Sequence, residues 1–258
     1  MKNYTSYDLI EWGKPFEKSQ HALPEPTLSE VLIRVTAAGL CHSDLHVQKG
    51  YMDLGEEGRL TFAERGAQLP MTFGHEIAGI VEAIGDKVKN VSIGQQVIVF
   101  PWIGCGDCLA CNEDRESDCS AMRIIGLKQK GGFATHCLIE NEKFLVNIDG
   151  LDAAEVVPHA CSGITVYNAL EKIGFLRDGE WLAVMGCGGL GLNAIAIAGA
   201  MGFDNIIGID IDNSKLDAAR EMGASKTLNS KSANSVAELQ KYAESRLMAV
   251  IDTFGGES

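Results

Sequence analysis

The chain has 258 residues, of which 46% are hydrophobic and 22% charged, and its formal net charge is -13 at pH 7. These values indicate a folded globular protein of about two domains and exclude disordered and collagen-like classes. An acidic surface repels a phosphate backbone, so nucleic acid is not expected as a partner. The sequence shows no secretory signal and no apolar run approaching 18 residues, so we expect a cytoplasmic protein without a membrane span.

The first part of the chain is rich in short apolar runs that are separated by Gly, Asp and Asn. Runs of this length between turn-forming residues are typical of strands, and several in succession indicate a barrel-like β domain. We predict strands over residues 31–35, 77–84, 95–100, 134–140 and 143–148.

From about Val156 the pattern changes to helices that alternate with apolar strands. Helices are predicted over 162–174, 192–202 and 214–223, and strands over 181–186, 205–210, 226–229 and 248–254. This alternation predicts a parallel, doubly wound sheet and hence an α/β domain. We expect a β-rich domain over residues 1–160 and a second domain over 161–258. The second has four strands where such sheets commonly have six, so we expect it to be incomplete at the C-terminus or to continue past Ser258.

The segment "GCGGLG" follows a predicted strand and opens a predicted helix. Gly186, Gly188 and Gly191 occupy the three glycine positions of G-x-G-x-x-G, which permit a tight turn, close approach of a pyrophosphate and close helix packing. With Gly189 they are our candidates for binding a dinucleotide. The alternative is a tight turn without a ligand.

Asp210 follows the second predicted strand, 24 positions after Gly186. A carboxylate at about this offset binds the ribose hydroxyls of NAD and repels the 2′-phosphate of NADP, so NAD is the predicted cofactor. Asp212 is a second candidate for this role. Lys215 either reaches the same ribose or is a solvated helix residue.

Four cysteines lie within one lobe, over about residues 101–121. Their C-x2-C-x2-C-x7-C spacing suits a tetrahedral, closed Zn2+ site, since two-residue gaps direct successive thiolates at one ion. Disulfides and an iron-sulfur cluster are the alternatives. The four residues are Cys105, Cys108, Cys111 and Cys119.

Other residues with metal-binding or acid–base chemistry are dispersed. They lie in "GLCHSDLH" (39–46), "GHEIAG" (74–79) and "PHACSGIT" (158–165). Each His or Cys taken alone is more often an ordinary structural residue than a ligand. Cys137 and Cys187 are interpreted as non-ligands.

These five motifs, taken in their order along the chain, resemble those of the zinc-dependent alcohol dehydrogenases of the medium-chain dehydrogenase/reductase superfamily. The resemblance covers essentially the whole chain and implies a GroES-like catalytic domain joined to a Rossmann domain. It also implies two Zn2+ per chain, NAD as cofactor, a small alcohol or carbonyl compound as substrate, and a homodimer or homotetramer. The segment between Cys41 and His75 is longer than in many family members.

The resemblance also implies roles for single residues. Cys41, His75 and Cys161 match the ligands of the catalytic zinc, and Glu76 matches the acidic residue beside it. The remaining matches are Ser43 and His46 to a proton relay, His42 to a pyrophosphate contact, Thr165 to a residue near the nicotinamide, and Asp44 to a carboxylate that orients the histidine ligand.

The predicted activity is reversible oxidation of a primary, secondary or cyclic alcohol to an aldehyde or ketone, with hydride transfer to NAD. Cys161, where polyol-specific relatives often have Glu, favours simple or cyclic alcohols. The alternatives are a polyol or other specialised medium-chain dehydrogenase, and a non-catalytic protein that binds zinc and a nucleotide.

Overall fold

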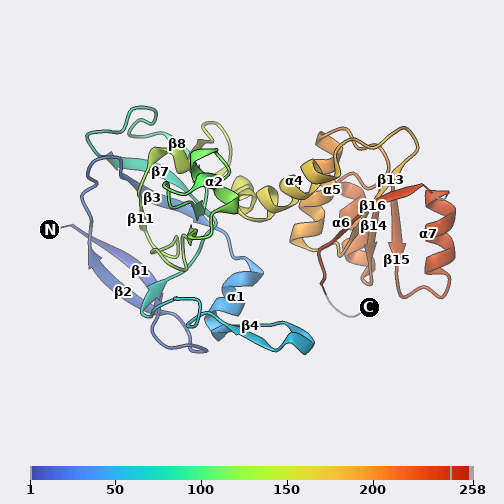
Figure 1. Ribbon diagram of the computed structural model, residues 1–258, viewed down its shortest axis with the longest axis horizontal. Coiled ribbons are helices and arrows are strands. Elements are labelled where there is room, and N and C mark those ends of the chain that lie inside the picture. Colours follow the sequence, from blue (N-terminus) through green and yellow to red (C-terminus); the bar gives the residue numbers. More distant parts are fainter. Residues whose placement is uncertain (1, 245, 256–258) are drawn as a thin grey trace. The chain divides into compact units, whose positions relative to one another are not determined.

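A computed structural model of the chain describes residues 2–244 and 246–255 (Figure 1). The chain divides into two compact units, Met1–Cys161 and Ser162–Ser258. Throughout the described ranges, every helix is too short or too polar to cross a membrane.

The first unit is built on two antiparallel sheets. One has the order β2-β1-β6 and the other the order β11-β3-β7-β8-β12. Strands β8 and β11 of the larger sheet alternate between half-buried and buried residues, while β3 and β7 each begin with three buried residues. The core of this sheet includes Ile33, Val81, Val97 and Ile139. The strands are β1 (Asn3–Leu9), β2 (Glu17–Ala22), β3 (Val31–Ala38), β6 (Met71–Thr72), β7 (Ile77–Ile84), β8 (Gln96–Val99), β11 (His136–Ile139) and β12 (Leu145–Asn147).

Shorter elements join these strands. The long segment between Cys41 and His75 forms helix α1 (His42–Lys49) and a hairpin of β4 (Tyr51–Asp53) and β5 (Arg59–Thr61) around η1 (Gly55–Glu57). Helix α1 ends at Gly50, where φ is 90°. The cysteine lobe holds β9 (Trp102–Ile103), α2 (Leu109–Asn112), η2 (Glu116–Asp118) and β10 (Arg123–Ile124). The unit closes with η3 (Glu142–Phe144), α3 (Ala153–Val156) and η4 (Val157–Ala160).

The second unit is a four-stranded parallel sheet with the order β15-β14-β13-β16. Numbered within the unit this order is 3-2-1-4, as in the doubly wound dinucleotide-binding fold. Helices α4, α5 and α6 pack on one face and α7 on the other (Figure 1). The elements are α4 (Ser162–Ile173), β13 (Trp181–Met185), α5 (Gly189–Ala200), β14 (Ile206–Asp210), α6 (Asn213–Glu221), β15 (Lys226–Asn229), α7 (Ser235–Ala243) and β16 (Leu247–Asp252).

The predicted fold class is confirmed: a β-rich unit precedes a parallel, doubly wound sheet. Helix α5 begins at Gly189, three residues before the predicted start, because the glycine loop itself forms its first turn. The predicted strand over 143–148 begins instead as η3, which the Asn141 side chain caps by accepting from the Lys143 N–H. The β1–β2 hairpin, α1 and α7 were not predicted.

Candidate functional site

Three separate segments of the first unit bring four potential metal ligands together. Cys41 directly precedes α1, His75 and Glu76 directly precede β7, and Cys161 follows η4. One ligand atom from each of these four residues lies within 4.8 Å of the other three. His75 and Glu76 are buried, and the two cysteines are half-buried. Residues 120 positions apart in the chain therefore converge on a single point.

The buried Asp44 carboxylate holds His75 in one orientation. Asp44 Oδ1 lies 3.2 Å from Nδ1 of His75, and Oδ2 accepts the backbone N–H of Cys41 at 3.0 Å. Because a carboxylate accepts hydrogen bonds, Nδ1 carries a proton and Nε2 is the nitrogen left to bind a metal ion, which would displace any proton there. Metal-binding histidines have this arrangement almost without exception.

The side chains of Cys41 and Cys161 lie within hydrogen-bonding distance of each other. Their sulfurs lie 3.9 Å apart. Hydrogen bonding from Cys161 lowers the pKa of Cys41 to about 3, while the same contact and burial raise the pKa of Cys161. For His75, burial opposes the imidazolium, but Asp44 and Cys41 outweigh it and raise the pKa to about 10. Two sulfurs, one imidazole nitrogen and a carboxylate form a donor set that fits Zn2+.

Glu76 packs against Gly39, which opens the motif over residues 39–46 but had no predicted role. The Gly39 N–H donates to the Glu76 carbonyl oxygen at 3.0 Å, and a Cβ on Gly39 would lie 1.9 Å from Glu76 Oε2. Burial and the nearby negative charge of Cys41 raise the pKa of Glu76 to about 7. Glycine at position 39 therefore makes room for the carboxylate beside the cysteine pair.

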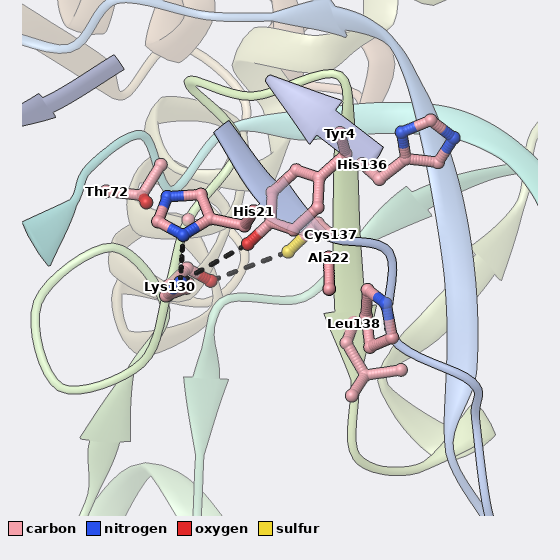
Figure 2. A pocket seen from close by; sticks show the side chains of 10 residues that line it. Tyr4, His21, Ala22, Thr72, Lys130, His136, Cys137 and Leu138 are labelled. Carbon is pink, nitrogen blue, oxygen red and sulfur yellow. Dashed lines mark hydrogen bonds between the residues drawn. The ribbon is translucent and has the colours of Figure 1, made fainter. Parts of the chain in front are cut away.

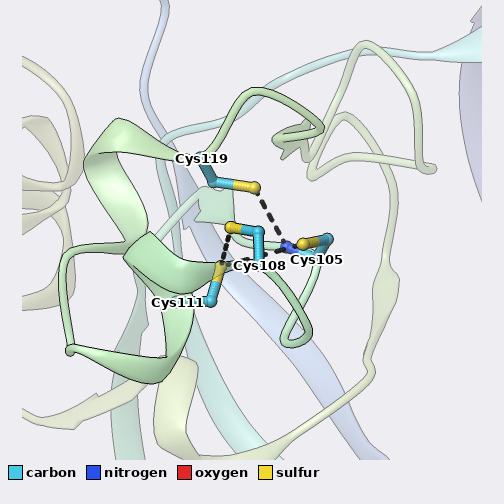
Figure 3. A group of neighbouring side chains, drawn as sticks. All are labelled: Cys105, Cys108, Cys111 and Cys119. Atoms are coloured by element: carbon cyan, nitrogen blue, oxygen red, sulfur yellow. Dashed lines mark hydrogen bonds between the residues drawn. The ribbon is translucent and has the colours of Figure 1, made fainter.

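The four lobe cysteines form a second cluster (Figure 3). One sulfur from each lies within 4.8 Å of the others. Cys108 Sγ is 3.5 Å and Cys105 Sγ 3.9 Å from Cys111 Sγ, and the Cys105 N–H donates to Cys119 Sγ at 3.3 Å. All eight cysteines of the chain are free, so the disulfide alternative has no support here.

The pKa values of two lobe thiols are shifted in opposite directions. Backbone N–H groups of Asp107 and Cys108 lower the pKa of Cys105 to about 6. The backbone of Gly106 favours the thiolate of Cys111, but burial and the neighbouring sulfurs outweigh it and raise that pKa to about 12. A divalent cation that neutralises several thiolates at once suits such a cluster, and four sulfurs fit a closed Zn2+ site.

Helix α1 carries the three residues that the resemblance assigns to the proton relay and the pyrophosphate contact. The hydroxyl and N–H of Ser43 hydrogen-bond to the Cys41 sulfur. The rings of His42 and His46 lie edge to face with centroids 4.9 Å apart. Burial, followed by the positive charges of His42 and Lys49, lowers the pKa of His46. Ser43 therefore lies beside the metal-ligand cluster, with His46 one turn further along the helix.

The glycine loop in the second unit is tightly closed. Gly186 has φ 87°, and Gly188 precedes the first turn of α5. A Cβ on Gly191 would lie 1.8 Å from the Gly186 carbonyl oxygen. Thr253, which follows β16 and which no motif indicated, donates to this same oxygen at 2.8 Å.

Asp210 lies at the carboxyl end of β14 and is buried. Its Oδ2 accepts the N–H of Cys187 at 2.8 Å, while Oδ1 accepts those of Ile211 and Asp212 at 2.7 and 3.0 Å. Lys215 Nζ lies 4.0 Å from Oδ2. The carboxylate is thus held against the glycine loop, close to the N-terminus of α5.

Asp212 has a local role, because its side chain accepts the Ser214 N–H at 2.8 Å and caps α6. Thr165 lies exposed near the start of α4, in the second unit. Cys187 is buried within the loop, and burial raises its pKa to about 11.

Family profiles match both units. Residues 27–150 match the alcohol dehydrogenase GroES-like domain, and residues 189–258 match the zinc-binding dehydrogenase domain. An NAD-dependent alcohol dehydrogenase of Sulfurisphaera tokodaii is 39% identical over 252 residues, which is 96% of this chain and 71% of that protein.

Solved structures agree with these matches. The alcohol dehydrogenase of Aeropyrum pernix superposes with a TM-score of 0.83 at 27% identity, over 96% of this chain and 71% of that one. The D-arabinose dehydrogenase of Sulfolobus solfataricus gives 0.82 at 28% identity, over 98% and 74%. The fold and the sequence define a medium-chain dehydrogenase, a class of oxidoreductases. Within it, the chain belongs to the zinc-type alcohol dehydrogenase family, which confirms the predicted resemblance.

Proposed function

We propose that the chain is an NAD-dependent zinc alcohol dehydrogenase that interconverts a primary, secondary or cyclic alcohol with its aldehyde or ketone. The observation that carries this proposal is the convergence of Cys41, His75 and Cys161, with Nδ1 of His75 fixed by Asp44. Three ligands with one position left for substrate are typical of catalytic zinc. Residues 1–160 are proposed as the catalytic domain and 161–258 as the NAD-binding domain.

The catalytic cluster would bind one Zn2+ and the lobe cysteines a second. Zinc held by Cys41, His75 and Cys161 supplies a Lewis acid that lowers the pKa of an alcohol hydroxyl, and NAD supplies the hydride acceptor. Glu76 is buried beside the same sulfurs and is a further ligand candidate. The lobe site has four sulfurs, so it is closed to substrate and structural.

Residues of α1 would move the substrate proton. Ser43 Oγ would accept it beside the cysteine pair while the hydroxyl gives up its own proton toward the imidazole of His46, which releases a proton to solvent. The lowered pKa of His46 keeps that ring neutral, and thus able to accept a proton, at neutral pH. His42, which packs against His46, would contact the cofactor pyrophosphate.

In the second unit, the loop glycines Gly186, Gly188, Gly189 and Gly191 would hold the pyrophosphate at the start of α5. Asp210, supported by Lys215, would bind the ribose hydroxyls and disfavour NADP. Thr165 would lie near the nicotinamide. The homodimeric or homotetrameric state and the cytoplasmic location stay predictions.

The test combines metal analysis with turnover. Purified protein should contain two zinc ions per chain and form NADH, followed by its absorbance, with simple or cyclic alcohols. Cys41→Ala should lose one zinc and abolish turnover while NAD still binds. A folded protein that contains only the lobe zinc and turns over no alcohol would refute the proposal.

A polyol or sugar substrate is the second candidate. It is favoured by the similarity to the D-arabinose dehydrogenase, whereas Cys161 as third ligand favours simpler alcohols. A substrate panel of primary, secondary and cyclic alcohols together with polyols decides between them, through the ratio of kcat/KM values.

A further inference from the structure

A cavity of about 350 Å³ opens in the first unit, away from the residues assigned to metal and cofactor (Figure 2). Its volume is at the lower end of the range for small-molecule sites. The wall comes from β1, β2, β11 and the segment before β11, and the residues that matter here are Tyr4, His21, Pro24, Lys130 and Leu138.

A buried carboxylate lies behind this cavity. Asp8 is 4% exposed, accepts the Thr72 hydroxyl at 2.6 Å and lies 3.1 Å from Nε2 of His21. Burial opposes ionisation of Asp8, but hydrogen bonds, the largest from Thr72, hold its pKa below the usual value. The Asp8 carboxylate and the Ser6 hydroxyl, which lies 2.9 Å from Nε2, therefore hold that edge of the His21 ring, and Nδ1 faces Lys130.

Lys130 points into the same space (Figure 2). Its Nζ lies 3.5 Å from Nδ1 of His21 and 3.3 Å from the Tyr4 hydroxyl. Neither partner is a carboxylate, and across residues 2–244 and 246–255 no carboxylate lies within ion-pair distance of this ammonium. The Lys130 ammonium therefore faces the cavity without a carboxylate in direct contact, because the His21 ring separates it from Asp8.

The rest of the wall includes the polar side chains of Thr72 and His136 but is mainly apolar. Pro24, Leu138, Ala22 and the ring of Tyr4 line the cavity beside the ammonium. Tyr4 is buried, and its hydroxyl accepts from Lys130, so its own proton is available to a ligand. One charge beside apolar walls matches a monoanion with an apolar body better than a doubly charged phosphate.

We propose that this cavity binds a small organic carboxylate. The carboxylate accepts hydrogen bonds from Lys130 Nζ and the Tyr4 hydroxyl, while the apolar body packs against Pro24 and Leu138. His21, fixed by Asp8, is a positioning residue that holds Lys130 in place. The site is independent of the proposed dehydrogenase activity.

Benzoate is the probe, and calorimetric titration of the zinc-loaded full chain is the measurement. Small ligands of this size bind with Kd values of about 1 mM. Loss of a charge-assisted hydrogen bond in Lys130→Met should weaken binding about tenfold or more. Tyr4→Phe should weaken it less. Lys128→Met removes a nearby exposed lysine that does not line the cavity, so it should bind benzoate as the natural chain does.

Because carboxylates also bind zinc, a separate measurement must show where on the protein benzoate binds. The ring signals of His21 in NMR spectra, assigned by their loss in His21→Gln, should shift as benzoate is added. Benzamide, which has the same shape without the charge, should leave them unchanged. The proposal is overturned if benzoate shifts no His21 signal, if Lys130→Met binds it equally well, or if benzamide or inorganic phosphate binds there more tightly. None of these outcomes depends on alcohol turnover.

Discussion

Asp44 Oδ1 lies 3.2 Å from Nδ1 of His75, so a carboxylate in the first turn of α1 sets which histidine nitrogen faces the cysteine pair. The same side chain accepts the Cys41 N–H and thereby fixes the start of the helix. One buried acid thus positions two proposed ligands from segments more than 30 residues apart.

The first prediction concerns this acid. Asp44→Asn keeps an oxygen for the Cys41 N–H but lets an amide donate to Nδ1, which reverses the histidine tautomer. Zinc affinity at the catalytic site should fall by about 10–100-fold, the usual effect of losing such a partner. Competition with a chromogenic chelator measures the change. Asp53→Asn, on the exposed β4–β5 hairpin, serves as the control, and equal affinities in the two variants would contradict the proposed orientation.

The second prediction separates the two clusters. Cys111→Ser removes a buried lobe sulfur, so zinc content should fall from two to one per chain and the thermal midpoint should decrease. Cys137→Ser changes an equally buried cysteine that belongs to neither cluster and should retain both ions. Metal analysis and thermal unfolding measure these effects. If Cys111→Ser kept two zinc ions, the lobe would not be a metal site.

The third prediction compares two glycines of α5. A Cβ on Gly191 would overlap the Gly186 carbonyl oxygen, whereas one on Gly199 meets nothing within 4 Å. Gly191→Ala should destabilise the protein by about 1–3 kcal/mol and weaken NAD binding. Gly199→Ala should stabilise it by about 0.4–1 kcal/mol, because it restricts the unfolded chain. Chemical denaturation and NAD titration test the pair, and equal stabilities would show that the loop backbone can relax.

The sequence predicted the elements whose periodicity is set by burial. Strand β7 and the alternating elements of the second unit lie close to the predicted residues because their apolar positions face a core. Helix α1 was missed because it has only two buried residues, and one of them is Asp44. Its formation depends on tertiary contacts at Cys41 and His75 that no local pattern contains.

The residues of the candidate site also divide into those that a local sequence pattern indicated and those that only the fold brings together. The spacing of the lobe cysteines indicated their cluster directly, since all four lie in one short segment. Cys41, His75 and Cys161 gained meaning only from the family resemblance, because their proximity depends on the fold. The roles of Gly39 and Thr253 were not predicted. Gly39 lies close to Glu76 and Thr253 hydrogen-bonds to Gly186, and contacts between residues far apart in the sequence cannot be inferred from residue type alone.

The final prediction addresses cofactor choice. Asp210 accepts three backbone N–H groups, so its negative charge is held in a fixed position at the end of β14. Asp210→Asn turns an amide N–H toward one of these donors and removes the charge that would repel a 2′-phosphate. NAD binding should weaken by about tenfold or more, and the preference for NAD over NADP should narrow.

Asp212→Asn is the matched control, because asparagine caps helices as well as aspartate does and this side chain is engaged with Ser214. Fluorescence titration with NADH and NADPH measures the affinity of each variant for both cofactors, and the ratio of the two affinities is the cofactor preference. If the two variants changed the cofactor preference equally, the discrimination would come from the overall charge of this edge and not from Asp210.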